Sequence, residues 1–180
     1  ELASLVPNLN WSGEGSRARY FQIRGTGELE QYDGAPNPSV GFIIDDRGEV
    51  ILVHHKTVPL LPVEHSMTPH DVFDWWIEKY GRNLDAFWPV VDTPLGRMGI
   101  MMANEGSYPE NARGLALNGC EVVYRASIPH PAASNDYFEI QNRARALDNN
   151  MYVLAPNMGT YYLTQDSQTP IDTFGGGSMI

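Results

Sequence analysis

A lysine and a glutamate interrupt an otherwise apolar and proline-rich stretch, VHHKTVPLLPVEH. Lys56 follows a run of apolar residues that predicts a buried strand over 49–55, and Glu64 lies in the loop behind it. Burying an ammonium group is costly unless it is paired, so these two side chains are candidates for charged groups of a functional site. The simpler alternative is that both lie on the surface and have no chemical role.

A second candidate place is the junction at Ala103. Here a predicted buried strand over 97–103 meets the loop NEGSYP and a helix that begins at Pro109. Ligands gather at the carboxyl ends of parallel strands, and the backbone N–H groups of such a turn can stabilise an oxyanion together with the helix N-terminus. This is a favoured seat for a nucleophile, yet alanine has no reactive group. An ordinary strand–helix loop would show the same pattern.

Two nearby side chains could replace the missing nucleophile. We interpret Ser107 as the N-cap of the helix, in a capping box with Glu110. Cys120 begins the next predicted strand, where a buried cysteine usually behaves as a small hydrophobe. The histidines form no metal-binding pattern. His54 and His55 face opposite ways in a strand, and either could border a site, although core or surface roles are more common.

The elements that must position these residues follow from apolar periodicity and from cap and turn residues. We expect Thr68 and Ser134 to cap two of the helices. The predicted strands are 40–45, 49–55, 87–93, 97–103, 120–127 and 151–157, and the predicted helices are 68–81, 109–118 and 135–149. Helices alternate with strands from residue 97 to residue 157, which predicts parallel pairing, while the first two strands predict an antiparallel hairpin. An α/β fold with mixed sheets is therefore expected.

Composition limits the classes of function. The 180 residues suffice for one domain with a buried core. A formal net charge of −10 argues against nucleic acid as a partner, and no apolar run is long enough to span a membrane. The single cysteine excludes an internal disulfide and fits a cytoplasmic location. The chain begins with Glu1 and breaks off at Ile180 after apolar residues, so we expect the central part of one domain, truncated at both ends.

Four ordered stretches make the sequence resemble the nitrilase superfamily, the carbon–nitrogen hydrolases. They are VGFIIDDRGEVILVHHKTVPLLPVE, DTPLGRMGIMMANEGSYPENARGLALNGCEVV, NRARALDNNMYVLAPN and GGGSMI. The first stretch is similar to a hairpin followed by the family's lysine motif and a glutamate. The next stretch resembles the family's nucleophile strand, elbow, helix and following strand. The resemblance covers roughly residues 40–180, with an insertion at about 66–86.

The resemblance implies a four-layer α-β-β-α sandwich and a Glu–Lys–Cys catalytic set. By position, Lys56 would be the family lysine that stabilises the oxyanion, and Glu64 the second glutamate, which places the substrate and the lysine. Ala103 stands where the nucleophilic cysteine should be, and the backbone N–H of Asn104 would donate to the oxyanion. The pocket wall would include Glu105 and Tyr108. The family's first glutamate, the general base, precedes the region covered and is not found in this chain.

Three accounts of Ala103 follow. It is an engineered replacement of cysteine, a natural member whose chemistry is lost or altered, or a misassigned residue. The neighbours Asn104, Glu105 and Gly106 depart mildly from the usual residues, which favours the natural variant.

Two classes of function are compatible with these patterns. A nucleotide-binding α/β domain is a weaker third option, because the sequence contains no phosphate-binding loop. The first is a hydrolase of small amides, nitriles or carbamoyl compounds that acts through a thioester. The second is a non-catalytic ligand-binding or scaffold protein on the same fold. The resemblance implies no cofactor and no metal, and it implies a homo-oligomer, a dimer or larger.

Overall fold

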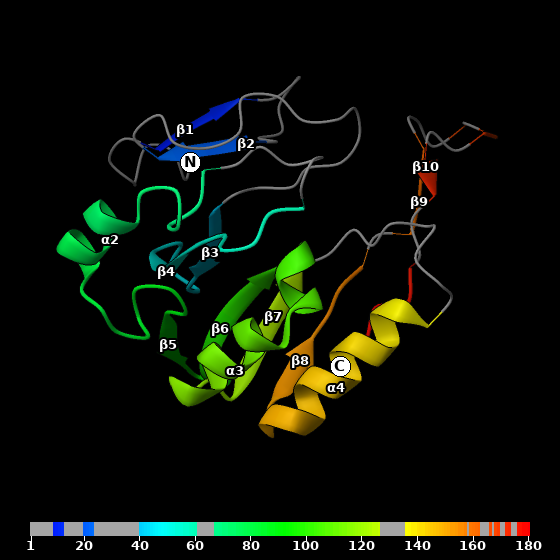
Figure 1. The fold of residues 1–180 in the computed structure, drawn as a ribbon. Coiled ribbons are helices and arrows are strands. Elements are labelled where there is room, and N and C mark those ends of the chain that lie inside the picture. Colours follow the sequence, from blue (N-terminus) through cyan, green and yellow to red (C-terminus); the bar gives the residue numbers. More distant parts are fainter. Residues whose placement is uncertain are drawn as a thin grey trace.

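A computed structural model describes the backbone of residues 9–12, 20–23, 40–60, 67–126, 136–157, 159–162, 166, 168–169, 172–173 and 176–180. Within this part of the chain a four-stranded sheet forms the centre of the fold (Figure 1). Its strands, in spatial order, are β5 (Val90–Thr93), β6 (Gly96–Met102), β7 (Val122–Ala126) and β8 (Tyr152–Leu154). β5 runs antiparallel to β6, whereas β6, β7 and β8 are parallel. The expected mixed sheet is confirmed.

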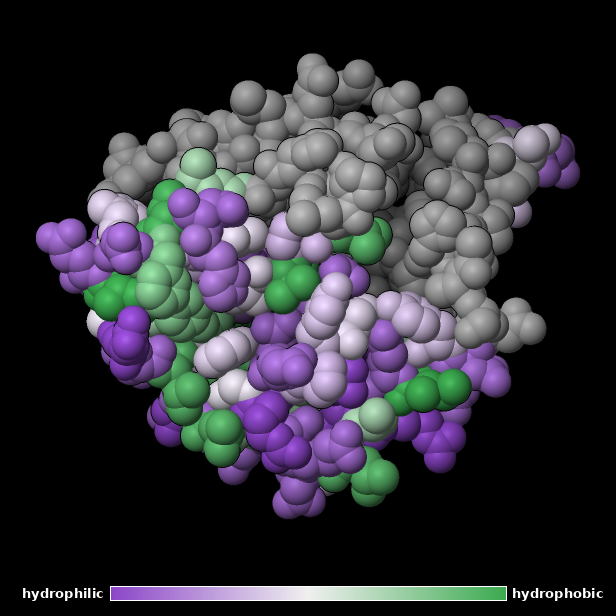
Figure 2. Space-filling model, viewed as in Figure 1, coloured by the Kyte–Doolittle hydropathy of each residue, from purple (hydrophilic) through white to green (hydrophobic). Residues whose placement is uncertain are grey.

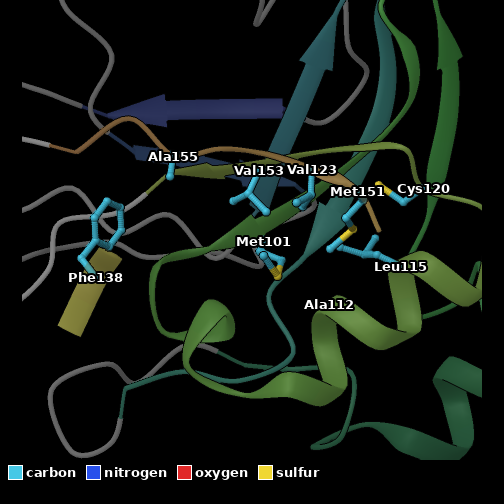
Figure 3. Packing of buried hydrophobic residues seen from close by; sticks show 9 residues of the cluster. All are labelled: Met101, Ala112, Leu115, Cys120, Val123, Phe138, Met151, Val153 and Ala155. Carbon is cyan, nitrogen blue, oxygen red and sulfur yellow. The ribbon is translucent and has the colours of Figure 1, made fainter. Parts of the chain in front are cut away.

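Two helices cover one face of this sheet, α3 (Pro109–Leu117) and α4 (Tyr137–Asn149) (Figure 1). The core between them and the strands is apolar and closely packed (Figure 3). Its buried members are Met101, Ala112, Leu115, Cys120, Val123, Phe138, Met151, Val153 and Ala155. Alternate residues of β6 and β7 point to this side because strand side chains alternate between faces. The helix face turned toward the viewer in Figure 2 is mostly hydrophilic, as expected of a solvent-facing surface.

A hairpin packs against the other face of the sheet. Its strands are β3 (Val40–Ile44) and β4 (Val50–His55), which pair antiparallel. A small apolar cluster joins the two layers, with Leu52 of the hairpin against Ile100 and Met102 of β6. Gly41 allows this close approach, because a Cβ there would lie 3.2 Å from side-chain atoms of both β6 residues. The layers thereby bring the end of β4 to the end of β6.

The remaining described elements are short. Two more antiparallel pairs are present, and helix α2 (Phe73–Tyr80) follows the hairpin. The pairs are β1 (Leu9–Ser12) with β2 (Tyr20–Ile23), and β9 (Thr160–Tyr161) with β10 (Asp172–Thr173). In the part of the chain that the structure describes, no helix has the length and apolar character needed to cross a membrane.

One predicted helix start and one predicted helix cap are wrong, whereas α3 begins at Pro109 as predicted. The helix predicted from Thr68 begins only at Phe73, because Asp71 Oδ2 accepts hydrogen bonds from the Thr68 N–H and hydroxyl and closes a separate turn. The N-cap of α3 is Tyr108, whose side chain makes no cap hydrogen bond, and Ser107 belongs to the preceding turn. Ser134, predicted to cap the next helix, lies outside the described residues.

Candidate active site

The end of β4 carries a row of buried polar residues. His54 is 1 % exposed, and so is Lys56, which follows the last strand residue. Thr57 comes next and is 4 % exposed. His55 points the other way, as predicted for neighbouring strand residues, and its ring packs edge-on against Trp76. The end of β4 and the two residues after it therefore place His54, Lys56 and Thr57 in the interior next to β6.

The end of β6 turns sharply at Ala103. The residues Ala103–Ser107 form a single 3₁₀ turn, η1, which we call the elbow. Ala103 has φ +44°, a left-handed conformation that costs a non-glycine residue about 1 kcal/mol or more. Such a conformation persists only where the surrounding contacts impose it. The predicted strand–helix junction is thus a constrained bend with Ala103 at its first position.

Glu105 ties the elbow to the end of β4. Its carboxylate is 1 % exposed, and Oε1 accepts the Thr57 backbone N–H at 2.6 Å. Oε2 accepts the Met102 N–H at 2.7 Å and lies 2.8 Å from His54 Nε2. The Thr57 hydroxyl lies 2.8 Å from Oε1. Because these partners come from β4, the segment behind it and β6, one carboxylate fixes the lysine-bearing segment against the elbow.

The carboxylate of Glu105 is held in its charged form. Burial alone raises the pKa of Glu105, but the charge of His54 and the hydrogen bonds from His54, Thr57 and Met102 outweigh it. The net effect is a pKa below the usual value. Glu105 is therefore a buried anion with its donors in place.

A second link joins the same two segments. The Asn104 side-chain amide donates to the Pro59 carbonyl at 3.2 Å. Asn111 of α3 donates to the Glu105 carbonyl at 3.1 Å, and its Oδ1 lies 3.0 Å from the Thr57 hydroxyl. The loop behind β4, the elbow and the first turn of α3 are thus bonded into one unit.

Two arginines support the elbow from the helix-covered side of the sheet. Arg125 of β7 is 1 % exposed, and its Nη2 donates to the Ala103 carbonyl at 3.3 Å. Arg145 of α4 is 8 % exposed and donates to the carbonyls of Gly106 at 3.2 Å and Ser107 at 3.0 Å. Three of the five elbow carbonyls are thereby held by guanidinium groups.

The sequence of this chain matches a known protein family. The family model described as carbon-nitrogen hydrolase matches residues 25–180. The chain belongs to the carbon–nitrogen hydrolase family. This is the nitrilase superfamily to which the sequence motifs pointed, and that prediction is confirmed.

Known relatives of this carbon–nitrogen hydrolase chain include amide-hydrolysing enzymes. A formamidase of Bacillus thuringiensis (strain Al Hakam) is 32% identical over 153 residues, which are 82% of this chain and 41% of the relative. The chain thus spans about two fifths of the length of the curated relatives it matches.

Two solved structures of the superfamily share the fold. Saccharomyces cerevisiae Nit3, of the nitrilase superfamily, is 19% identical with a TM-score of 0.53, over 72% of this chain and 41% of that one. A mutant amidase from Nesterenkonia sp. AN1 is 19% identical with a TM-score of 0.54, over 77% and 45%. Its structure shows covalent addition of the acetamide moiety of fluoroacetamide at the active-site cysteine. The predicted nitrilase-type α/β fold is confirmed.

The carbon–nitrogen hydrolase chain brings most of the predicted site residues together. Lys56, Ala103, Asn104 and Glu105 lie at the joined ends of β4 and β6. Glu105 is buried and bonded to protein groups, so it underlies the elbow and does not present its carboxylate to an open pocket. Tyr108 is 46% exposed at the start of α3. Glu64 lies outside the described residues.

Neither alternative nucleophile has the surroundings of a reactive group. The Ser107 hydroxyl lies 2.6 Å from the Tyr137 hydroxyl of α4, so it joins two elements. Cys120 is 6% exposed. Burial, together with a smaller contribution from Glu121, raises the pKa of its thiol to about 11, while hydrogen bonds and Arg97 lower it. Within the described residues, no group of three or more His, Cys, Asp or Glu side chains could hold a metal ion.

Sequence patterns do not reveal the residues that hold the elbow in place. They leave the role of His54 open and give no role to Thr57, Arg125 or Arg145. One signal does exist, since an arginine inside the apolar strand sequence CEVVYRAS must either reach solvent or find buried acceptors. The pairing of His54 with Glu105 leaves no such signal, because it depends on two strands that are distant in the sequence.

Proposed function

We propose that this chain is the nucleophile-bearing part of a hydrolase that cleaves the carbon–nitrogen bond of a small amide, with the nucleophile position occupied by Ala103. The observation that carries the proposal is the Glu105 bridge. It fixes a constrained bend at residue 103 against the segment that carries the buried Lys56. The formamidase relatives support a small amide as the substrate class, and the family resemblance extends that class to nitriles and carbamoyl compounds.

In this proposal the chemistry follows the Glu–Lys–Cys scheme. A thiolate at position 103 attacks the amide carbon and gives a tetrahedral oxyanion. Lys56 and the Asn104 N–H stabilise the oxyanion, while Glu64 places the substrate and the lysine. The carbon–nitrogen bond then breaks, ammonia leaves with a proton from the general base, and a thioester remains. Water attacks the thioester, which releases the carboxylic acid and restores the thiol.

Ala103 removes the first step of this scheme. A methyl group cannot attack a carbonyl carbon, so the chain with Ala103 is inactive in this proposal. Ala103 also favours a second candidate function, a non-catalytic ligand-binding or scaffold protein that uses the same site. A homo-oligomer and a cytoplasmic location remain part of the proposal. They rest on the family resemblance and on the single cysteine.

The test uses the full-length protein as it is and with Ala103→Cys. Ammonia release is measured over a panel of formamide, acetamide, longer aliphatic amides, nitriles and carbamoyl compounds. We expect turnover only with Ala103→Cys. Adding Cys120→Ala should preserve that turnover, and adding Lys56→Met should abolish it, which separates the proposed site from the buried native thiol.

Other results would change the assignment. Activity of the Ala103 protein itself would mean that position 103 is not the nucleophile. If neither form turns over any compound but acetamide binds to the Ala103 protein by calorimetry, the ligand-binding function replaces the hydrolase.

A further inference from the structure

Two buried positive charges beneath the elbow have no role in the scheme above. Within the part of the chain that the structure describes, Arg125 and Arg145, which we call the arginine pair, donate only to neutral oxygens. Besides the elbow carbonyls, Arg125 donates to Asn142 Oδ1 and to Gln141 Oε1, both at 2.7 Å. Its Nε has no hydrogen-bond partner. Among the described residues, neither arginine forms a salt bridge with a carboxylate.

An unpaired buried guanidinium needs a reason. Taking a charge out of water is costly, and proteins normally offset this cost with an opposite charge. Here asparagine and glutamine stand at the two closest positions, where aspartate and glutamate would fit with little change in shape. Burial lowers the pKa of Arg125 to about 10, Tyr137 partly opposes this, and Arg145 adds to it, so Arg125 keeps its charge at neutral pH. The positive charge is therefore preserved where it could have been neutralised.

The contacts of Arg125 also set the direction of a peptide group. In a trans peptide the C=O and the next N–H point in opposite directions. Because the Ala103 carbonyl points at Arg125, the Asn104 N–H points away from it. Gly106 makes room for this arrangement, since a Cβ there would overlap the Arg125 side chain. The guanidinium also lies 5.1 Å from the centre of the Phe138 ring, which covers it from α4.

We propose that Arg125, with support from Arg145, is a positioning residue for the nucleophile position. Its unneutralised charge stabilises an anion at residue 103, and its hydrogen bond to the Ala103 carbonyl directs the Asn104 N–H toward the oxyanion. This inference rests on the proposed function, because it needs a thiolate or an oxyanion at that place. It adds a residue from β7 to a site otherwise built from the ends of β4 and β6.

Other ionisable groups surround the elbow and also affect the stability of an anion at residue 103. Among the described residues they are His54 and Lys56 from the β4 end, Glu105 in the elbow, Tyr108 behind it, and Tyr137 and Arg145 from α4. Glu105 is the one buried carboxylate among them, and it is bonded to His54 and two backbone N–H groups. The arginine pair therefore supplies charge that Glu105 does not cancel.

The decisive variant is Asn142→Asp, made in full-length protein that also carries Ala103→Cys. Aspartate has the shape of asparagine and keeps an oxygen for Arg125, and the Asn142 Nδ2 has no partner to lose. A merely structural arginine would tolerate this change or gain an ion pair. Our proposal instead predicts that neutralising Arg125 makes alkylation of the introduced thiol by iodoacetamide about tenfold slower at pH 7, with the pH midpoint moved upward by about one unit.

Two further variants separate charge from hydrogen bonding. Arg125→Lys keeps the charge and loses the Ala103 contact, so the pH midpoint of alkylation should stay while kcat for an amide falls by roughly 10²-fold with little change in KM. Arg125→Met should lose both. Asn150→Asp, which adds the same charge at the far end of α4, is the control and should leave the alkylation profile unchanged.

The outcomes distinguish a failure of this inference from a failure of the proposed function. An unchanged alkylation profile in a stably folded Asn142→Asp protein would overturn the inference. If that variant does not fold, identical alkylation profiles for Arg125→Lys and Arg125→Met would overturn it instead. Alkylation needs no amide turnover. A shifted profile in a protein that hydrolyses nothing would therefore support the inference and count against the hydrolase.

Discussion

At the scale of single residues, the site depends on side chains that hold other groups in place. Ala103 has a conformation that alanine rarely adopts, and the polar groups around it come from other elements. Glu105 accepts from two backbone N–H groups and one imidazole at distances of 2.6–2.8 Å. Hydrogen bonds to a charged acceptor are about twice as strong as neutral ones. The geometry of the elbow therefore depends more on Glu105 than on residue 103 itself.

We expect Glu105→Gln to be strongly destabilising. The glutamine amide nitrogen would face donors such as the Thr57 or Met102 N–H, leaving a buried donor without an acceptor. The expected loss is roughly 2–4 kcal/mol of unfolding free energy at pH 7, measured by urea titration. Asp71→Asn is the matched control. Asp71 also accepts from a threonine N–H and hydroxyl but is exposed, so its loss should be smaller.

The same variant should change the acid dependence of stability. The folded-state pKa of Glu105 lies below the ordinary glutamate value of 4.5, since the charge and hydrogen bonds of its partners outweigh burial. A depressed carboxyl pKa contributes stability above the unfolded-state pKa, and this is lost as the pH falls through the folded-state pKa. Between pH 7 and pH 3 the parent should therefore lose more stability than Glu105→Gln. Parallel curves below pH 4.5 would contradict a charged Glu105.

At the scale of elements, the elbow is fastened to its neighbours by side chains from three directions. His54 of β4 contacts Glu105 of the elbow. Arg125 of β7 and the α4 residues Arg145 and Tyr137 contact the elbow from the other side of the sheet. Ser107 is the elbow's own contribution to the last of these contacts. Its hydroxyl, which the sequence predicted to cap α3, bonds instead to Tyr137.

A double-mutant cycle on Ser107 and Tyr137 tests this contact. We expect Ser107→Ala and Tyr137→Phe each to cost about 1 kcal/mol, with a coupling energy of similar size, because either change alone removes the same hydrogen bond. A capping role for Ser107 would instead give an effect independent of Tyr137. Glu110→Gln, at the other end of the predicted capping box, should change stability by less than about 0.5 kcal/mol.

The sequence predicts elements well here because each element repeats a local pattern. Apolar runs located β3, β4, β6 and β7 to within a few residues, and they placed Lys56 and Ala103 at strand ends. The start of α2 was missed because Thr68 and Asp71 look like a helix cap whether or not the turn continues into a helix. The bond from Arg125 to Asn142 joins a strand to a helix face, and no periodicity records such a pair.

At the scale of the whole molecule, the mixed sheet determines which distant residues meet. The hairpin lies on one face of the sheet and α3 and α4 on the other, so the end of β6 is contacted from both sides (Figure 1). The anionic bridge at Glu105 connects to the hairpin side, and the arginine pair belongs to the helix side. A site of this kind exists only in the assembled fold, since none of its links joins residues of a single element.

Cys120 offers a measure of how firmly that assembly holds. Its Sγ lies in the apolar core and contacts the Val122 carbonyl at 3.3 Å. Burial chiefly, with a smaller contribution from Glu121, raises the pKa of its thiol to about 11, although hydrogen bonds and Arg97 oppose this shift. About one thiol in ten thousand is therefore ionised at pH 7, even before the access of the reagent is considered. Iodoacetamide should therefore reach Cys120 only when the molecule opens.

We expect Cys120 labelling, followed by peptide mass spectrometry, to rise with urea along the same curve as unfolding monitored by tryptophan fluorescence. Leu115→Ala, in the same cluster, should lower unfolding free energy by about 2–5 kcal/mol and increase labelling by the matching factor. Labelling that is fast in native buffer and insensitive to urea would mean that the junction of α3 and β7 opens locally.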